Sequence, residues 1–250
     1  MEGLGKGESE LTDSRAQILR KVRQALTTPG HQTSLTGPIC NADQPTLCAS
    51  APHDGSLVQR FQAEFERASG ELRVCSDGLC AVEFIKSFIE GEGIQSVAVS
   101  RHEICQRLNL VKRLLEMLPQ VRFLTEEIDS EYPFERDRLK EQMAKVPLSI
   151  TGIDYLVAET GTLVALAHPS ASRQISLLPE VHMVLATPHQ IHPNLSELFA
   201  EIQARHGTDL PGSMITLITG PSRTADIEKV LIKGVHGPTR LVTLLLEKLE

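Results

Sequence analysis

The sequence predicts an α/β protein with a mostly parallel sheet flanked by helices. From Leu57 onward, apolar residues at helical spacing alternate with short apolar runs, a pattern typical of helices that alternate with strands. Elements that alternate in this way favour a parallel sheet covered on both faces. The length of 250 residues suffices for one large domain of this class, or for two small ones.

The N-terminal part differs from the rest in composition. Residues 1–13 are polar, which favours disorder, and Ala16–Leu26 carries its apolar residues on one face of a predicted amphipathic helix. Residues 27–56 are rich in Thr, Pro, Gly and Ser and indicate a linker or a long surface loop. We therefore expect an N-terminal tail, helix and linker over residues 1–56, followed by one α/β domain over residues 57–250.

The first half of this domain is expected to alternate regularly. Apolar residues three or four apart predict each helix, and short apolar runs predict each strand. The expected elements are a helix over Leu57–Phe65, a strand at Leu72–Cys75, a helix over Val82–Ile89, a strand at Ser96–Val99, a helix over Val111–Leu118, a strand at Val121–Leu124 and a charged helix over Arg136–Val146.

The second half is richer in strands. Two β-rich runs flank a Gly turn at residues 159–161, which predicts a strand, a tight turn and a second strand. The expected elements are strands at Ser149–Val157, Thr162–Ala167, Ile175–Leu178 and His182–Ala186, a helix from Asn194 or Ser196 through Ala204, a strand at Ser213–Thr219, a polar loop at Gly220–Asp226 that opens a short helix, and a strand at Leu241–Leu246.

Composition argues against several classes of function. A formal charge of −7, two Tyr and no Trp disfavour a nucleic-acid binder. No apolar run reaches the roughly 18 residues of a membrane span, and the N-terminus lacks a secretory core, so a cytoplasmic protein is expected. The five cysteines form no C-x-x-C pair, which leaves no motif for a zinc ribbon or an iron–sulfur cluster. We assign no role to Cys40 and Cys48, and we expect no cofactor bound by this chain alone.

A polar loop follows the strand predicted at Ser213–Thr219. A Gly turn that enters a helix presents free backbone N–H groups to an anion, and Gly220, Ser222, Arg223 and Thr224 would add side-chain and backbone donors. The alternative is an ordinary capped helix start, with Asp226 and Glu228 favourable in its first turn. The loop is not a Walker A motif, because its spacing differs.

The Gly turn at 159–161 and the histidines supply candidate proton carriers. Glu159, next to Thr160, would sit at a sheet end, where burial raises a carboxyl pKa and suits it to acid–base or covalent work; a solvated turn is the alternative. Six of the nine histidines lie in residues 168–236, and His182 and His236 are the best candidates. Arg173 could complete an anion pocket or be an ordinary surface charge. His182, His189 and His192 lack the spacing of a metal site, so no metal is expected.

The last hundred residues resemble the LUD-domain family, in its lactate-utilisation C (LutC/YkgG) branch. The likeness rests on four motifs in order: AETGTL, LLPEVH, ITGPSRTADIE and GVHGP. The N-terminal SRAQILRKVRQAL segment fits that branch too. The family's recurrent polar positions would fall on Glu159, Thr160, Arg173, His182, Ser222, Arg223, Thr224, Asp226, Glu228 and His236.

The resemblance implies a fold similar to the NagB/RpiA/CoA transferase group and a part in oxidising L-lactate to pyruvate. In that family two partner proteins are expected to carry the iron–sulfur chemistry, so this chain would be a non-redox component that binds an organic acid anion or supports its partners. Two other functions stay open. One is a stand-alone enzyme for a small anionic, sugar-phosphate or acyl-CoA substrate; the other is an assembly protein whose polar cluster is structural.

Overall fold

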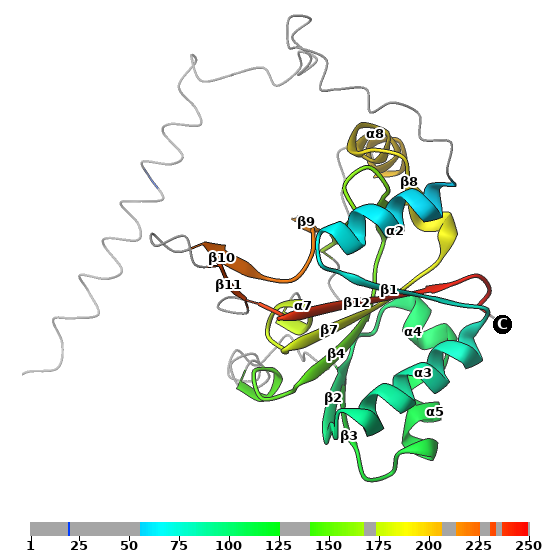
Figure 1. Ribbon diagram of the computed structural model, residues 1–250, viewed down its shortest axis with the longest axis vertical. Coiled ribbons are helices and arrows are strands. Elements are labelled where there is room, and N and C mark those ends of the chain that lie inside the picture. The colour runs from blue at the N-terminus through cyan, green and yellow to red at the C-terminus, as the bar shows by residue number, and fades with distance from the viewer. Residues whose placement is uncertain are drawn as a thin grey trace, which may run out of the picture. The chain divides into compact units, whose positions relative to one another are not determined.

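The computed structural model (Figure 1) describes Arg20 and residues 56–125, 141–167, 174–206, 214–225, 231–233 and 237–249. Apart from Arg20, which is helical, all of these belong to one compact unit, Ser50–Glu250. The predicted helix at Ala16–Leu26 otherwise lies outside the described residues, as does the predicted linker up to residue 55. Of the charged helix predicted at Arg136–Val146, residues 136–140 also lie outside them, and residues 141–143 are helical. None of the described helices is long and apolar enough to cross a membrane.

A six-stranded sheet forms the centre of the domain, and all of its strand pairs are parallel. This confirms the predicted fold class. In spatial order the strands are β1 (Glu71–Cys75), β12 (Arg240–Leu246), β7 (Val181–Ala186), β4 (Leu148–Gly152), β2 (Ser96–Val99) and β3 (Arg122–Thr125).

Helices and a second sheet cover the two faces of the central sheet (Figure 1). Alternate side chains of β7 show the division: Met183 and Leu185 join one buried cluster, whereas Val184 and Ala186 join another. The first cluster packs under three helices: α3 (Gly78–Gly91), α4 (Glu103–Arg107) and α5 (Leu110–Met117). The second lies under α2 (Leu57–Arg67) and the smaller sheet. Helix α4 was not predicted.

The smaller sheet has four strands in the order β8-β5-β6-β9. Its strands are β5 (Tyr155–Val157), β6 (Thr162–Leu166), β8 (Ile191–His192) and β9 (Ile215–Ile218), and β5 and β6 form the predicted antiparallel hairpin. Helix α8 (Leu195–His206) packs Leu198 and Ile202 against Tyr155, Val157 and Val164 of this sheet. The short 3₁₀ helix η1 (Pro188–Gln190) precedes β8.

The single strand predicted at Ser149–Val157 is wrong, because the chain leaves one sheet and enters the other within it. The break falls at Ile153 and Asp154. The Gln190 amide donates to both of their carbonyls, and the Asp154 carboxylate accepts the Leu166 N–H at 2.7 Å. The Gln190 side chain thus satisfies both carbonyls at the break, and the backbone of β6 satisfies Asp154, whose N–H donates to the Val164 carbonyl at 3.2 Å.

Two further elements differ from the prediction. Residues expected to form a strand at Ile175–Leu178 instead belong to a helix, α7 (Gln174–Leu177). The loop that begins at Gly220 leads into a strand, β10 (Arg223–Ala225), and not into the predicted helix. Strand β10 pairs with β11 (Leu231–Lys233). The Ser222 N–H donates to the Pro238 carbonyl at 2.8 Å, and this long-range bond holds the loop extended toward the start of β12.

Candidate functional site

His182 lies at the second position of β7, between β4 and β12. Its side chain is buried, at 1% exposure, and its Nε2 is 2.8 Å from the Thr151 hydroxyl of β4. Its Nδ1 has no hydrogen-bond partner among the described residues. Burial lowers the pKa of His182 to about 4, so the ring is neutral at pH 7. In either tautomer Nδ1 keeps an unused donor or acceptor.

Two hollows meet at this ring. One has a volume of about 60 Å³ and the other about 220 Å³, and both are lined by Ser176, His182, Thr216 and Ile218. A space of the smaller size holds a few water molecules or a molecule of a few heavy atoms. The smaller hollow runs toward the carboxyl ends of β2 and β4, whereas the larger one runs toward Gly220 and the loop before β12.

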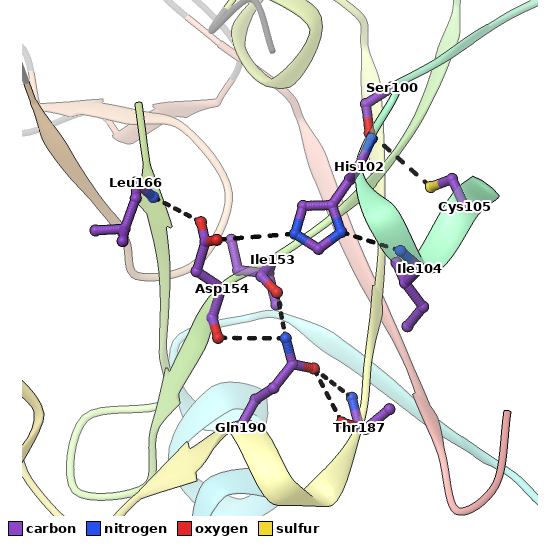
Figure 2. Close-up of polar contacts among 9 residues, drawn as sticks. All are labelled: Ser100, His102, Ile104, Cys105, Ile153, Asp154, Leu166, Thr187 and Gln190. Atoms are coloured by element: carbon purple, nitrogen blue, oxygen red, sulfur yellow. Dashed lines mark hydrogen bonds and ion pairs between the residues drawn. The ribbon is translucent and has the colours of Figure 1, made fainter. Parts of the chain in front are cut away.

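A second histidine, His102, borders the smaller hollow, and Figure 2 shows its polar contacts. His102 caps α4, because its Nδ1 accepts the Ile104 N–H at 3.4 Å. The neutral ring therefore carries its proton on Nε2, which faces Asp154 Oδ1 at 3.9 Å. His102 and Asp154 are both partly exposed, at 25% and 33% of their side-chain surface. The imidazole and the carboxylate thus lie beside each other at the border of the smaller hollow.

Gly152 makes room for this pair. A Cβ atom at Gly152 would lie 2.0 Å from Nδ1 of His102, a separation that real side chains do not tolerate. The His102 ring thus packs directly on the backbone at the end of β4. His102 follows β2, and Asp154 follows β4, so both come from the carboxyl ends of parallel strands, where ligands of open α/β sheets bind.

The polar side chains that line the two hollows suit uncharged polar groups of a ligand. It combines the two imidazoles and the Asp154 carboxylate with the hydroxyls of Ser100, Thr151, Ser176, Thr216, Thr219 and Ser222. No Lys or Arg is among the described residues that line them. Such a site can donate to and accept from a ligand hydroxyl or carbonyl and can move a proton, whereas a ligand carboxylate needs a cation from elsewhere.

The predicted residues of the hairpin turn lie away from these hollows. Glu159 and Thr160 are half-buried between β5 and β6, and neither lines either hollow. The Thr160 hydroxyl is 2.7 Å from that of Thr162, which is 2.7 Å from that of Thr219. Gly161, at φ +59°, lies so close to α2 that a Cβ would approach the Phe65 nitrogen to 2.3 Å. The turn thus packs on α2, and a role for Glu159 in proton transfer stays a prediction.

The predicted anion loop is divided between two places. Gly220 and Ser222 line the larger hollow with His182. Arg223 is exposed, and its Nη2 donates to the Ala68 carbonyl at 2.6 Å, just beyond the end of α2. Thr224 lies in β10. The other four predicted residues, Arg173, Asp226, Glu228 and His236, lie outside the described residues.

The sequence analysis missed His102, Thr151 and Asp154. A signal was present for His102, which follows the strand predicted at Ser96–Val99, because polar residues at that position mark the ligand edge of a parallel sheet. Asp154 lay inside the strand predicted at Ser149–Val157. Among the described residues, no group of three or more His, Cys, Asp or Glu side chains is placed to hold a metal ion.

Comparisons with known proteins agree on one family. Residues 58–246 match the family model described as LUD domain. "Lactate utilization protein C" from Halalkalibacterium halodurans is 38% identical over 115 residues, which cover 45% of this chain and 50% of that protein. A protein of the same name from an Exiguobacterium species is 36% identical over 44% of this chain and 48% of its own length. "Uncharacterized protein YkgG" from Escherichia coli is 33% identical over 42% and 46%.

The chain thus spans about half the length of the curated relatives that it matches. In a comparison of structures, a DUF162 family protein from Deinococcus radiodurans aligns with a TM-score of 0.49 and 18% identity, covering 76% of this chain and 96% of that one.

The contact between Gly152 and His102 predicts that Gly152→Ala lowers the free energy of unfolding by about 1–3 kcal/mol, because the added methyl must displace the ring. Chemical denaturation measures this, and the imidazole NMR signals of His102 should shift. The control is Gly91→Ala in α3, where a Cβ meets no atom within 4 Å and stability should hold or rise. Equal effects of the two substitutions would contradict the close packing.

Burial of His182 predicts a pH-dependent stability. Its pKa falls from 6.5 to about 4 on folding, so between these values the unfolded chain binds more protons than the folded one. The free energy of unfolding should therefore decrease, by up to about 3 kcal/mol, as the pH falls through this window. Urea denaturation at several pH values should show that His182→Gln loses this component, while His189→Gln, at an exposed histidine, keeps it. The same pH profile in all three proteins would be incompatible with a buried neutral His182.

Proposed function

The chain belongs to the LUD domain family, and on that premise we propose that it is a component of an L-lactate oxidation system. The support is its similarity to proteins named for lactate utilisation, at 33–38% identity over part of their length. In this proposal the chain binds the organic acid and handles its protons, and it does not itself accept the electrons.

One observation carries the proposal at the level of the site: the Nδ1 atom of the buried His182 has no hydrogen-bond partner among the described residues, and the His182 side chain borders both hollows. A buried polar atom without a hydrogen-bond partner destabilises the folded protein by about 1–3 kcal/mol, unless a ligand or water supplies the hydrogen bond. Lactate has a hydroxyl that can bond to Nδ1, and the product pyruvate has a carbonyl oxygen at the same carbon. The two hollows that meet at His182 together have room for such a three-carbon acid.

Proton transfer is assigned to His102 rather than to His182. A pKa near 4 makes His182 a weak base at pH 7, so its role is to hold and orient the substrate oxygen. His102 and the Asp154 carboxylate lie beside each other at the border of the smaller hollow, and we assign the uptake of the hydroxyl proton to this pair. The carboxylate of the acid is assigned to the Gly220 N–H and the Ser222 hydroxyl, whose residues line the larger hollow, with Arg173 and His236 as further candidates.

The electrons must leave through another protein. Oxidation of lactate to pyruvate releases two electrons and two protons, and the sequence contains no C-x-x-C motif or other sign of a redox centre. We therefore assign the electron acceptor to iron–sulfur partner proteins that bind this chain.

Growth on L-lactate tests the proposal. In a host that lacks any other lactate dehydrogenase, deletion of the gene should abolish growth on L-lactate, and the wild-type gene should restore it. His182→Gln should lower lactate consumption by about tenfold, as expected for the loss of one ligand hydrogen bond, and His189→Gln should match the wild type. Full growth of the deletion strain would refute the lactate role; full rescue by a folded His182→Gln protein would refute the assigned site.

A further inference from the structure

A third hollow lies at the carboxyl ends of β2 and β3, over α4 and α5. Its volume is about 680 Å³, within the range of sites for small organic ligands. Val99 and Thr125 are the last residues of the two strands and form one wall. Among the described lining residues, only Ser100 is shared with the hollows around His182. No role assigned above uses this space.

Positive charge borders this hollow. Arg101 and Lys112 both line it, both are exposed, and neither has an ion-pair partner among the described residues. One acidic residue, Glu116, also lines it, so the charged side chains leave a surplus of one positive charge. The first turn of α5 opens on the same space, and its N-cap Asn109 makes no side-chain hydrogen bond to that turn. The first turn of a helix favours an anion through its N–H groups and its dipole.

The rest of the lining is mainly aliphatic. Leu110, Val111 and Leu115 come from α5, and Leu115 keeps 44% of its surface exposed although it is a large apolar residue. No aromatic side chain is among the described lining residues, so a nucleobase or a flavin would find no ring to stack on. The lining fits an aliphatic group better than a planar one.

We propose that this hollow binds a small amphipathic anion, with its carboxylate or phosphate on Arg101 and Lys112 and its aliphatic chain on Val111 and Leu115. The site is separate from the one assigned to lactate, and its occupant differs in chemistry, because it needs an apolar body. The proposal therefore stands or falls independently of the lactate role.

Calorimetric titration of the full chain tests the proposal with three probes of equal chain length: octanoate, octyl phosphate and 1-octanol. At least one of the two anions should bind saturably, and octanol should bind more weakly by about tenfold or more. Comparing octanoate with octyl phosphate distinguishes the two head groups. Binding by neither anion, or equal binding by octanol, would overturn the proposal.

Substitutions then locate the site. Arg101→Ala and Lys112→Ala should each weaken anion binding by about fivefold or more, and both residues are exposed, so folding should be preserved. Leu115→Glu places a carboxylate in the hollow at a half-exposed helix position and should abolish binding. Lys145→Ala, at an exposed lysine outside the hollow, is the matched control. Unchanged affinity in the first three variants, or an equal loss in the control, would contradict the assignment.

Discussion

Of the two ring nitrogens of the buried His182, one is hydrogen-bonded and the other is not, and this difference determines how the site can work. One nitrogen is fixed by Thr151 of the neighbouring strand, while the other has no partner among the described residues, and the ring borders both hollows. Burial keeps the ring neutral, so it binds a ligand through one directional hydrogen bond and not through charge. A residue so placed favours a ligand with a hydroxyl or carbonyl, which is the functional group that changes between lactate and pyruvate.

The switch between sheets at Ile153 and Asp154 creates this arrangement. If the chain continued β4 into β5 as one strand, Asp154 would not face His102, and no space would separate the two sheets beside His182. Gln190 and Leu166 hold the switch by hydrogen bonds to the Ile153 and Asp154 carbonyls and to the Asp154 carboxylate. The same contacts thus fix the fold where the chain changes sheets and orient the Asp154 carboxylate that faces His102.

Much of the fold could be predicted from the sequence, because helical spacing and short apolar runs report burial directly. Strands such as Ser96–Val99 match their predicted bounds. The sheet switch could not be predicted, because Ser149–Val157 is apolar on both sides of the break, and only long-range contacts to Gln190 and Leu166 reveal it. The Gly220 loop favoured a helix by its local composition, yet a bond from Ser222 to Pro238 holds it extended.

The site was predictable only in part. His182 was found because a histidine within an apolar strand is conspicuous, and Gly220 and Ser222 do share a hollow with it. Arg223 was predicted to bind an anion because of its neighbours in the sequence. A guanidinium can also donate to a carbonyl at the end of a helix, and here it donates to the Ala68 carbonyl. His102 is a single polar residue after a short strand, and its importance becomes visible only where Gly152 and Asp154 meet it.

The most direct test is ¹⁵N NMR of the His182 imidazole during titration with L-lactate, with the signal assigned by its absence in His182→Gln. If Nδ1 binds the substrate hydroxyl, its resonance should shift saturably with L-lactate. Propionate, which has the same carbon chain and carboxylate but no hydroxyl, should leave it nearly unchanged. An Nδ1 resonance that does not respond to L-lactate, or that responds equally to propionate, would contradict the central claim that His182 holds the hydroxyl of the acid.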